Sequence, residues 1–293
     1  MSNTDLIIPE RPRDIGDFLV GRLLPFRKKR MVGPFIFIDH MGPTSLGPDH
    51  YMDVDQHPHI GLTTLTFLLE GEIEHCDSLG TKQVIKPGSV NWMVAGAGVS
   101  HTERTPQAIR NGQICRVHGY QIWVALPKEK ESIAPSFHHF DESQLPQWNV
   151  GPNQWKLVAG SAFGKESPVP VHSPLFMLEL KCSETNRINL QGQIKGEVGI
   201  CIVKGSVKAC EHHVKAGELL VSKEENVCDL EVEANSHILF FGGQAFAEKR
   251  HIYWNFVSSS ATKIEEAKEA WENWNWPKVA GDSSYVPLPG SKT

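Results

Sequence analysis

The stretch His57-Pro58-His59 constrains the fold of this chain more than any other feature. It leads into residues 61–69, which read as a strand rich in leucine and threonine. Residues two apart on a strand point to the same side, so both imidazoles share one face, and that face becomes mostly apolar along the run. Buried imidazoles are costly unless something binds them, and a face of this kind therefore indicates a ligand.

A second pair with the same spacing follows a glycine-rich turn, at His101-Thr102-Glu103. Gly98 can adopt a positive φ and direct this segment back toward the first pair. A single H-x-H is common, and His-Pro-His is also typical of a plain turn at a strand entry. Two such pairs beside strand-like sequence favour a site in which three imidazoles and one carboxylate converge on a divalent metal. The predicted ligands are His57, His59, His101 and Glu103.

The composition fits an all-β protein with frequent turns. The chain has 293 residues, enough for two domains, and its 25 glycines and 19 prolines separate many short apolar runs. A formal net charge of -5 argues against a nucleic-acid-binding surface. No apolar run approaches membrane-spanning length and no signal pattern is present, so we expect a cytoplasmic protein, nuclear as well in a eukaryote, without membrane contact. The six cysteines, which form no C-x-x-C pair, are predicted to be reduced thiols.

Two further segments have plain interpretations. The basic run Arg27–Arg30 could serve localisation or nucleic-acid binding, but a solvated loop before a strand suits the acidic balance better. Residues 127–170 carry several prolines and are predicted to be a linker with some strand content. His138 and His139 lie in this segment, and adjacent residues of an extended chain point to opposite sides, so we expect both at the surface.

An internal repeat indicates two barrels. Residues 67–90 and 201–219 share one order: an apolar run ends in a charged residue and glycine, and a strand, an x-Lys-x-Gly turn and another strand follow. The second copy has no H-x-H before its first glycine, so we predict that it binds no metal. Its rival cluster, Glu211-His212-His213, lies in a predicted turn, and adjacent histidines make a poor ligand pair.

The C-terminal segment departs from the β pattern. Thr262 and Glu265 match a capping box. Apolar residues from Ile264 to Trp274 recur at helical spacing, and Pro277 lies beyond the end of the pattern. The sequence thus predicts three parts: a metal-binding barrel at 1–130, a degenerate barrel at 131–250, and a helical tail at 251–293 that packs on the barrels.

Several stretches of the sequence resemble the pirin family of the cupin superfamily, and the resemblance covers nearly the whole chain. It implies a bicupin, with two antiparallel β-barrels of the cupin or jelly-roll type and a C-terminal helix. The first barrel would bind metal and the second would be degenerate. The stretches that carry the resemblance are Val32–Pro43 (VGPFIFIDHMGP), His57–Gly61 (HPHIG), Leu69–His75 (LEGEIEH), Asp77–Gly80 (DSLG), Asn91–Gly96 (NWMVAG), His101–Glu103 (HTE), Gln121–Pro127 (QIWVALP) and Arg250–Ser259 (RHIYWNFVSS).

The resemblance implies four iron ligands, namely His57, His59, His101 and Glu103. Fe(II) is the metal it favours, with Mn, Ni, Co, Cu and Zn as alternatives. Many cupins place a glutamate ligand four residues after the second histidine, where this chain has Thr63, so Glu103 has to supply the carboxylate. Ala125 stands where the family frequently has asparagine, so the chain departs from the family pattern at this position.

Three neutral imidazoles and one carboxylate would leave Fe(II) up to two open octahedral positions, which is typical of a catalytic site. Several pirin-like proteins are flavonol 2,3-dioxygenases. The resemblance therefore implies an enzyme that opens a quercetin-type ring with O2 and releases carbon monoxide, with Glu103 as the general base. Its partners would be a small aromatic substrate and O2, and we expect a monomer.

The competing interpretation is not enzymatic. Some family members act as iron-binding, redox-sensing co-regulators that bind a transcription factor, and others are proposed to bind metabolic enzymes. Both interpretations use the same four ligands, so the ligands do not separate them. The basic run Arg27–Arg30 slightly favours a surface for a protein partner.

Overall fold

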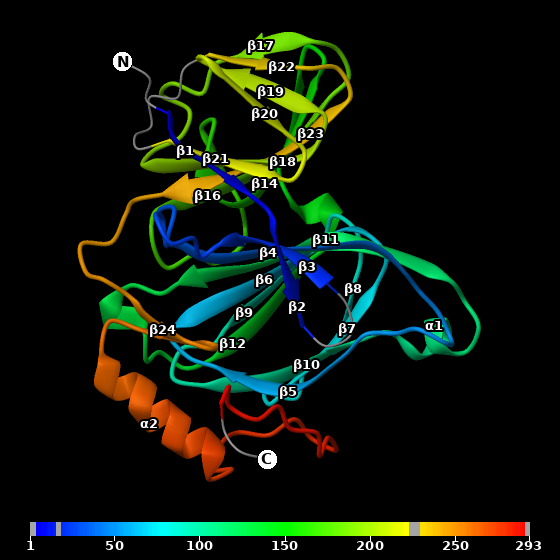
Figure 1. The fold of residues 1–293 in the computed structure, drawn as a ribbon, viewed down its shortest axis with the longest axis vertical. Coiled ribbons are helices and arrows are strands. Elements are labelled where there is room, and N and C mark those ends of the chain that lie inside the picture. The colour runs from blue at the N-terminus through cyan, green and yellow to red at the C-terminus, as the bar shows by residue number, and fades with distance from the viewer. Residues whose placement is uncertain (1–3, 16–18, 223–228, 291–293) are drawn as a thin grey trace. The chain divides into compact units, whose positions relative to one another are not determined.

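A computed structural model of the chain describes residues 4–15, 19–222 and 229–290 (Figure 1). Within them, contacts along and between strands define two compact units. Both consist mainly of antiparallel strands, so the predicted all-β architecture with two barrels is confirmed. Unit 1 comprises Gly21–Asp39, Phe140–Phe246 and the chain up to Pro12, and unit 2 comprises Arg13–Val20, His40–His139 and the chain from Ala247 onward.

Two sheets lie entirely within the described part of unit 1. The larger has the order β1 (Thr4–Pro9), β21 (Glu218–Ser222), β18 (Glu197–Lys204), β23 (Ser236–Gly243), β16 (Leu175–Cys182), β14 (Asn153–Ala162) and β13 (Gln147–Val150), with β15 (Lys165–Glu166) paired to β14. The smaller has the order β17 (Asn186–Ile188), β22 (Leu230–Val232), β19 (Ser206–Ala209) and β20 (His212–Lys215). The first strand of the chain belongs here because Ile8 on β1 pairs with Leu219 on β21.

A row of apolar side chains crosses the larger sheet of unit 1. The residues lie directly opposite one another on five neighbouring strands, and each is at most 1% exposed. Cross-strand pairs of this kind are the main source of stability in a sheet. The row is the centre of the core of this unit, and it consists of Leu157, Leu178, Phe240, Ile200 and Leu220.

Unit 2 is built on a larger and a smaller sheet, followed by the hairpin β24 (His251–Tyr253) and β25 (Phe256–Ser258). The larger sheet has the order β12 (Ser136–Phe140), β9 (Val90–Val94), β6 (Leu62–Glu70), β11 (Cys115–Ala125), β4 (Phe35–Leu46), β3 (Leu19–Leu24) and β2 (Arg11–Asp14), and each of the last three strands has residues assigned to unit 1 as well. The smaller has the order β5 (Asp53–His59), β10 (Val99–Arg104), β7 (Ile73–Asp77) and β8 (Lys82–Ile85). Buried residues of both sheets, among them Leu68 and Val117 from the larger and Ile73 and Ile85 from the smaller, form one apolar cluster.

The strands predicted after the first histidine pair are confirmed as β6 to β11, but the pair itself lies differently. His57-Pro58-His59 ends a strand of its own, β5, instead of leading into β6. Gly61 separates the two strands with a φ of +67°, and a Cβ atom there would lie 1.9 Å from the carbonyl oxygen of Val257. Only glycine fits this turn. The two histidines therefore lie in the smaller sheet, and β6 lies in the larger one.

The predicted C-terminal helix is confirmed as α2 (Ala261–Glu272), drawn in orange in Figure 1. It buries Ile264, Ala267 and Trp271 in an apolar cluster with Phe256. The predicted capping box is wrong, because the helix begins after Ser260, which makes no side-chain cap. The other helical segments are short, namely α1 (Gln107–Arg110), η1 (Lys128–Lys130) and η2 (Glu142–Gln144). None of the helices described is long and apolar enough to cross a membrane.

The segment predicted as a linker, residues 127–170, is mostly folded, so that prediction is wrong. It holds β12 to β15, and its prolines fall between these strands rather than in a flexible connection. His138 and His139 lie on β12 and are half-buried instead of exposed. His139 Nδ1 lies 2.5 Å from Asn91 Oδ1 on the neighbouring strand.

The basic run forms a turn closed by paired main-chain groups of Phe26 and Lys29. Arg27, Lys28 and Arg30 are exposed, as predicted for a solvated loop. Lys29 is engaged within unit 1, where its Nζ lies 2.5 Å from Glu197 Oε1.

The cysteines agree with prediction only in part. Cys76, Cys115 and Cys182 are free thiols. Cys210 is disulfide-bonded, so the prediction of a reduced thiol is wrong at this position. Cys228 lies outside the described residues.

Candidate metal centre

Strands β5 and β10 bring the predicted histidines together. They are antiparallel neighbours, with His101 opposite His57 and Val99 opposite His59. Because alternate residues of a strand face the same way, all three imidazoles project from one side of the sheet. Their ligand atoms lie within 4.8 Å of one another, and the side chains are buried. Across the described ranges, no other three residues of the ligating types have this spacing.

The ring nitrogens of the triad are arranged for a common ligand. His59 Nε2 lies 3.1 Å from His101 Nε2. His57 Nδ1 lies 2.8 Å from the main-chain oxygen of Asp55, which leaves His57 Nε2 for the centre. Two imidazole lone pairs at such a distance repel each other unless a proton or a cation lies between them. The donor set therefore fits a divalent cation held by nitrogen ligands.

Burial keeps these histidines neutral at physiological pH. Loss of hydration lowers the pKa of His57 from 6.5 to about 4, although the carbonyl group of Asp55 acts in the opposite direction. The pKa values of His59 and His101 are lowered well below 6.5, first by burial and then by the imidazole of His57. A neutral imidazole retains the lone pair that a metal requires.

Glu103 lies on the same strand as His101, but its carboxylate is not among the atoms that meet the 4.8 Å spacing. A β-bulge separates the two residues in the pairing with β5. Thr66 Oγ1, on β6 of the facing sheet, lies 2.9 Å from both Glu103 Oε1 and Gln121 Oε1. Burial raises the pKa of Glu103, against the effects of His75 and of the Thr66 hydrogen bond. Glu103 is therefore a buried carboxyl group of raised basicity beside the triad.

The larger sheet closes the site with an aromatic ring. Trp123 on β11 meets His59 edge to face, with ring centroids 5.2 Å apart. His57 and Glu103 each retain 8% exposure, whereas the other two histidines retain 1%.

A fourth histidine, His75, contacts His101 of the triad, and no role is predicted for it from the sequence. His75 on β7 is buried, with Nδ1 3.2 Å from His101 Nδ1 and Nε2 3.1 Å from Asp77 Oδ2. Burial acts to raise the pKa of Asp77, but hydrogen bonds from His75 and Thr81 outweigh it and the pKa is lowered. The available signal is the i, i+2 spacing of His75, in a run that reads as a strand, and Asp77, at the start of the following turn, which repeats the spacing of the two ligand pairs.

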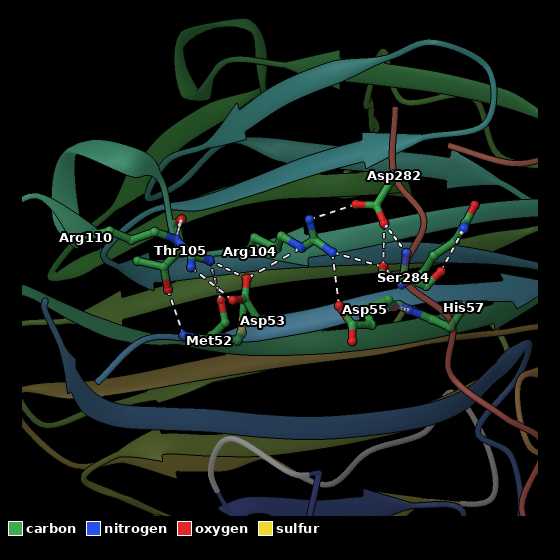
Figure 2. Close-up of polar contacts among 10 residues, drawn as sticks. Met52, Asp53, Asp55, His57, Arg104, Thr105, Arg110, Asp282 and Ser284 are labelled. Atoms are coloured by element: carbon green, nitrogen blue, oxygen red, sulfur yellow. Dashed lines mark hydrogen bonds and ion pairs between the residues drawn. The ribbon is translucent and has the colours of Figure 1, made fainter. Parts of the chain in front are cut away.

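The far side of β5 and β10 is covered by residues 277–286, here called the strap. On β5, the side chain of Gln56 is fully buried. It accepts a 2.6 Å hydrogen bond from a strap main-chain N–H group and donates a 3.0 Å bond to the main-chain oxygen of Ser284. On β10, Arg104 reaches Asp282 Oδ2 at 2.7 Å and Ser284 Oγ at 3.0 Å (Figure 2). The strap therefore joins the two strands that carry the triad.

Arg104 is also the centre of a charged cluster (Figure 2). It lies 3.0 Å from Asp55 Oδ1 and 3.5 Å from Asp53 Oδ1. Asp53 in turn pairs with Arg110 through both carboxylate oxygens. Apart from Arg110, these side chains are about one-third exposed or more, so water screens their charges. The ion pairs therefore contribute more to the geometry of the cluster than to the stability of the fold.

The rival cluster in unit 1 is placed differently from the triad. His212 and His213 begin β20, where neighbouring residues face opposite ways. His213 Nε2 lies 2.9 Å from Ser206 Oγ and 3.6 Å from Glu233 Oε1, and its side chain is 63% exposed. Neither histidine belongs to a group of ligand spacing in the described part of the chain.

These features define a class of protein: two β-barrels, one of which carries a buried triad of neutral histidines suited to a metal ion. Residues 18–124 match the model of the Pirin family, and residues 177–277 match that of the Pirin C-terminal cupin domain. The chain belongs to the pirin family, and both barrels are cupin domains. The predicted family and bicupin fold are confirmed.

Known relatives span nearly the whole chain. A pirin-like protein of Caulobacter vibrioides is 42% identical over 289 residues, which is 97% of this chain and 99% of that protein. A Pseudomonas aeruginosa protein provisionally named quercetin 2,3-dioxygenase is 36% identical over 88% of this chain and 80% of that protein. The crystal structure of a quercetin 2,3-dioxygenase from Acinetobacter baumannii has a TM-score of 0.88 at 32% identity, and the match covers 98% of this chain and 97% of that one.

Proposed function

We propose that this protein is an iron-dependent flavonol 2,3-dioxygenase, which opens a quercetin-type flavonol with O2 and releases carbon monoxide. The observation that carries the proposal is the buried group of three neutral imidazoles beside a carboxyl group of raised pKa. The similarity to a structure named as a quercetin 2,3-dioxygenase, at 32% identity over nearly the full length, supports the substrate class.

Fe(II) is the metal that we assign to this site. Three neutral nitrogen donors with one carboxylate suit Fe(II) and leave coordination positions for other ligands. We assign the carboxylate to Glu103, through Oε2, because Oε1 is engaged by Thr66. When bound, the metal supplies a Lewis-acid site for the flavonol oxygens and a redox centre for O2. The three nitrogen ligands are His57, His59 and His101.

Glu103 is the general base for the 3-hydroxyl group of the flavonol. Burial raises the pKa of Glu103, so its carboxylate is a stronger base than that of an exposed glutamate. Thr66 fixes the orientation of the carboxyl group through its 2.9 Å hydrogen bond to Oε1. The ring of Trp123 against His59 fills space that water would otherwise occupy.

The test measures O2 uptake and carbon monoxide release by Fe(II)-loaded protein with quercetin as substrate. His57→Ala should lose most of its iron, because it lacks one of four ligands. Glu103→Gln keeps an oxygen that can coordinate but cannot accept a proton, so turnover at saturating Fe(II) should fall by about 10²–10⁴-fold. His213→Ala, at an exposed position of unit 1, is the matched control and should retain both iron and turnover.

Two outcomes would contradict this proposal. A Glu103→Gln variant that works at the wild-type rate would exclude Glu103 as the base. Iron-loaded wild-type protein that consumes no O2 with any flavonol would refute the dioxygenase and favour the co-regulator interpretation.

A further inference from the structure

Strand β7 pairs with β10, the strand that carries His101 and Glu103. In the antiparallel pairing, Asp77 lies opposite His101 and His75 lies opposite Glu103. The exposures of His75 and Asp77 are 3% and 1%. Polar groups are buried in this way only when they are hydrogen-bonded, so the direction of each bond is informative.

The hydrogen bonds of Asp77 fix that direction. Its Oδ1 accepts the main-chain N–H groups of Leu79 and Thr81 at 2.9 and 3.0 Å, so the carboxylate acts as an acceptor. Its Oδ2 lies 3.1 Å from His75 Nε2. Since an ionised carboxylate can only accept, His75 Nε2 carries a proton and donates it.

The other nitrogen of His75 extends the chain of bonds to His101. With its proton on Nε2, a neutral His75 has a lone pair on Nδ1, which lies 3.2 Å from His101 Nδ1. His101 then donates from Nδ1 and keeps its own lone pair on Nε2. That Nε2 lies 3.1 Å from His59 Nε2, in the centre of the triad. In the reversed arrangement, His101 Nε2 would carry the proton and could not bind a metal.

We propose that His75 and Asp77 are positioning residues, which hold the proton of His101 on Nδ1 and thereby present its Nε2 lone pair to the metal. The proposal rests on the metal centre described under the proposed function. It also sets His101 apart from His57, whose Nδ1 faces a neutral carbonyl group, that of Asp55. An imidazole linked to a carboxylate is the more basic ligand, so His101 should donate more strongly than His57.

Asp77→Asn is the informative variant. The amide keeps the shape of the side chain, and its oxygen still accepts the two main-chain N–H groups. Its nitrogen, however, now faces His75 Nε2 and donates to it. His75 must then carry its proton on Nδ1, and the proton of His101 moves to Nε2. His75→Phe is the second variant, because it breaks the link but keeps a ring to stack on Phe137, whose centroid lies 4.7 Å away.

Two measurements detect the change of the His101 tautomer and its effect on metal binding. Nitrogen-15 NMR of the histidine-labelled, metal-free protein reports which ring nitrogen of His101 is protonated. We expect Nδ1 in the wild type and Nε2 in Asp77→Asn. Fe(II) affinity, measured anaerobically against a chromophoric chelator, should fall by about 10–100-fold in Asp77→Asn and by less in His75→Phe, since only the first reverses the tautomer. His251→Asn, exposed on β24, is the control and should keep the wild-type affinity.

The outcomes separate this proposal from the proposed function. A wild-type His101 protonated on Nε2, or an unchanged tautomer in Asp77→Asn, would overturn the positioning role. Equal losses of Fe(II) affinity in the two variants would also overturn it, because they would indicate packing alone. Wild-type protein that shows the Nδ1 proton but binds no Fe(II) would refute the metal centre while supporting the tautomer assignment.

Discussion

Acidification should destabilise the metal-free protein, and His57 supplies the magnitude. Burial lowers the pKa of His57 from 6.5 to about 4 in the folded protein. In the unfolded chain the same imidazole is hydrated and titrates near its ordinary value of about 6.5. Between these two values the unfolded state binds more protons than the folded state, so the free energy of unfolding decreases as the pH falls.

The contribution of His57 is complete above pH 6.5 and is lost progressively toward pH 4. A pH of 5 lies about 1.5 units below the pKa of His57 in the unfolded chain. At about 1.36 kcal/mol per unit, the free energy of unfolding is therefore lower by about 2 kcal/mol. His59 and His101 act in the same direction, because their pKa values are also lowered. Glu103 acts against them, since a raised carboxyl pKa favours the folded state as the pH falls.

The assay compares urea unfolding of the wild type and His57→Asn at pH 8 and pH 5, with EDTA present. Between these pH values, the variant should lose about 2 kcal/mol less unfolding free energy than the wild type, because it lacks the titrating group. Because Glu103 is present in both proteins, its opposing contribution to the pH dependence of the unfolding free energy cancels in the difference between them. His251→Asn, at an exposed position, should show the wild-type loss. Equal pH dependence in the wild type and His57→Asn would refute a buried neutral imidazole at this position.

Two further variants test buried contacts of unit 2. Arg250→Met removes the partner of Glu131, whose side chain is 2% exposed and lies 3.2 Å from the guanidinium group. Because the buried carboxylate loses its counter-charge and keeps only the hydrogen bonds from Ser258 and Ser259, the unfolding free energy should fall by roughly 3–5 kcal/mol in urea, and a loss below about 1 kcal/mol would speak against this pair. Gln56→Ala leaves two strap main-chain groups unpaired, so it should cost roughly 2–4 kcal/mol. It should also accelerate amide exchange in residues 277–286, and unchanged exchange would show that other contacts hold the strap.

The strands and the histidines of the triad could be predicted because both depend on neighbouring residues alone. Short apolar runs bounded by turn residues predict β6, β9 and β11 whatever sheet they join. The i, i+2 spacing of His57 and His59 places both on one side of any strand, and only the approach of His101 required the fold. The repeated order of runs and turns likewise predicts a second barrel without knowledge of its partners.

Features that join distant segments could not be predicted in this way. The role of His75 depends on β7 lying beside β10, and the spacing of His75 and Asp77 alone does not show which strand will pair with them. The turn at Gly61 looked like part of a strand, because the need for glycine comes from the carbonyl group of Val257, far along the chain. The strap has no periodic pattern, and its place follows from single hydrogen bonds to Gln56.

The two barrels differ in how their buried polar groups are neutralised. In unit 1, Glu179 Oε2 lies 2.8 Å from Lys156 Nζ, and its Oε1 lies 2.8 Å from His237 Nε2. Burial would raise the pKa of Glu179, but these two partners lower it to about 2, so the carboxylate already has a counter-charge in Lys156. In unit 2, three neutral imidazoles lie together, and the carboxyl group of raised pKa beside them accepts a hydrogen bond from the uncharged hydroxyl of Thr66. Imidazole lone pairs that face one another in a buried site are best satisfied by a bound cation. This is the physical basis for assigning the metal to this barrel.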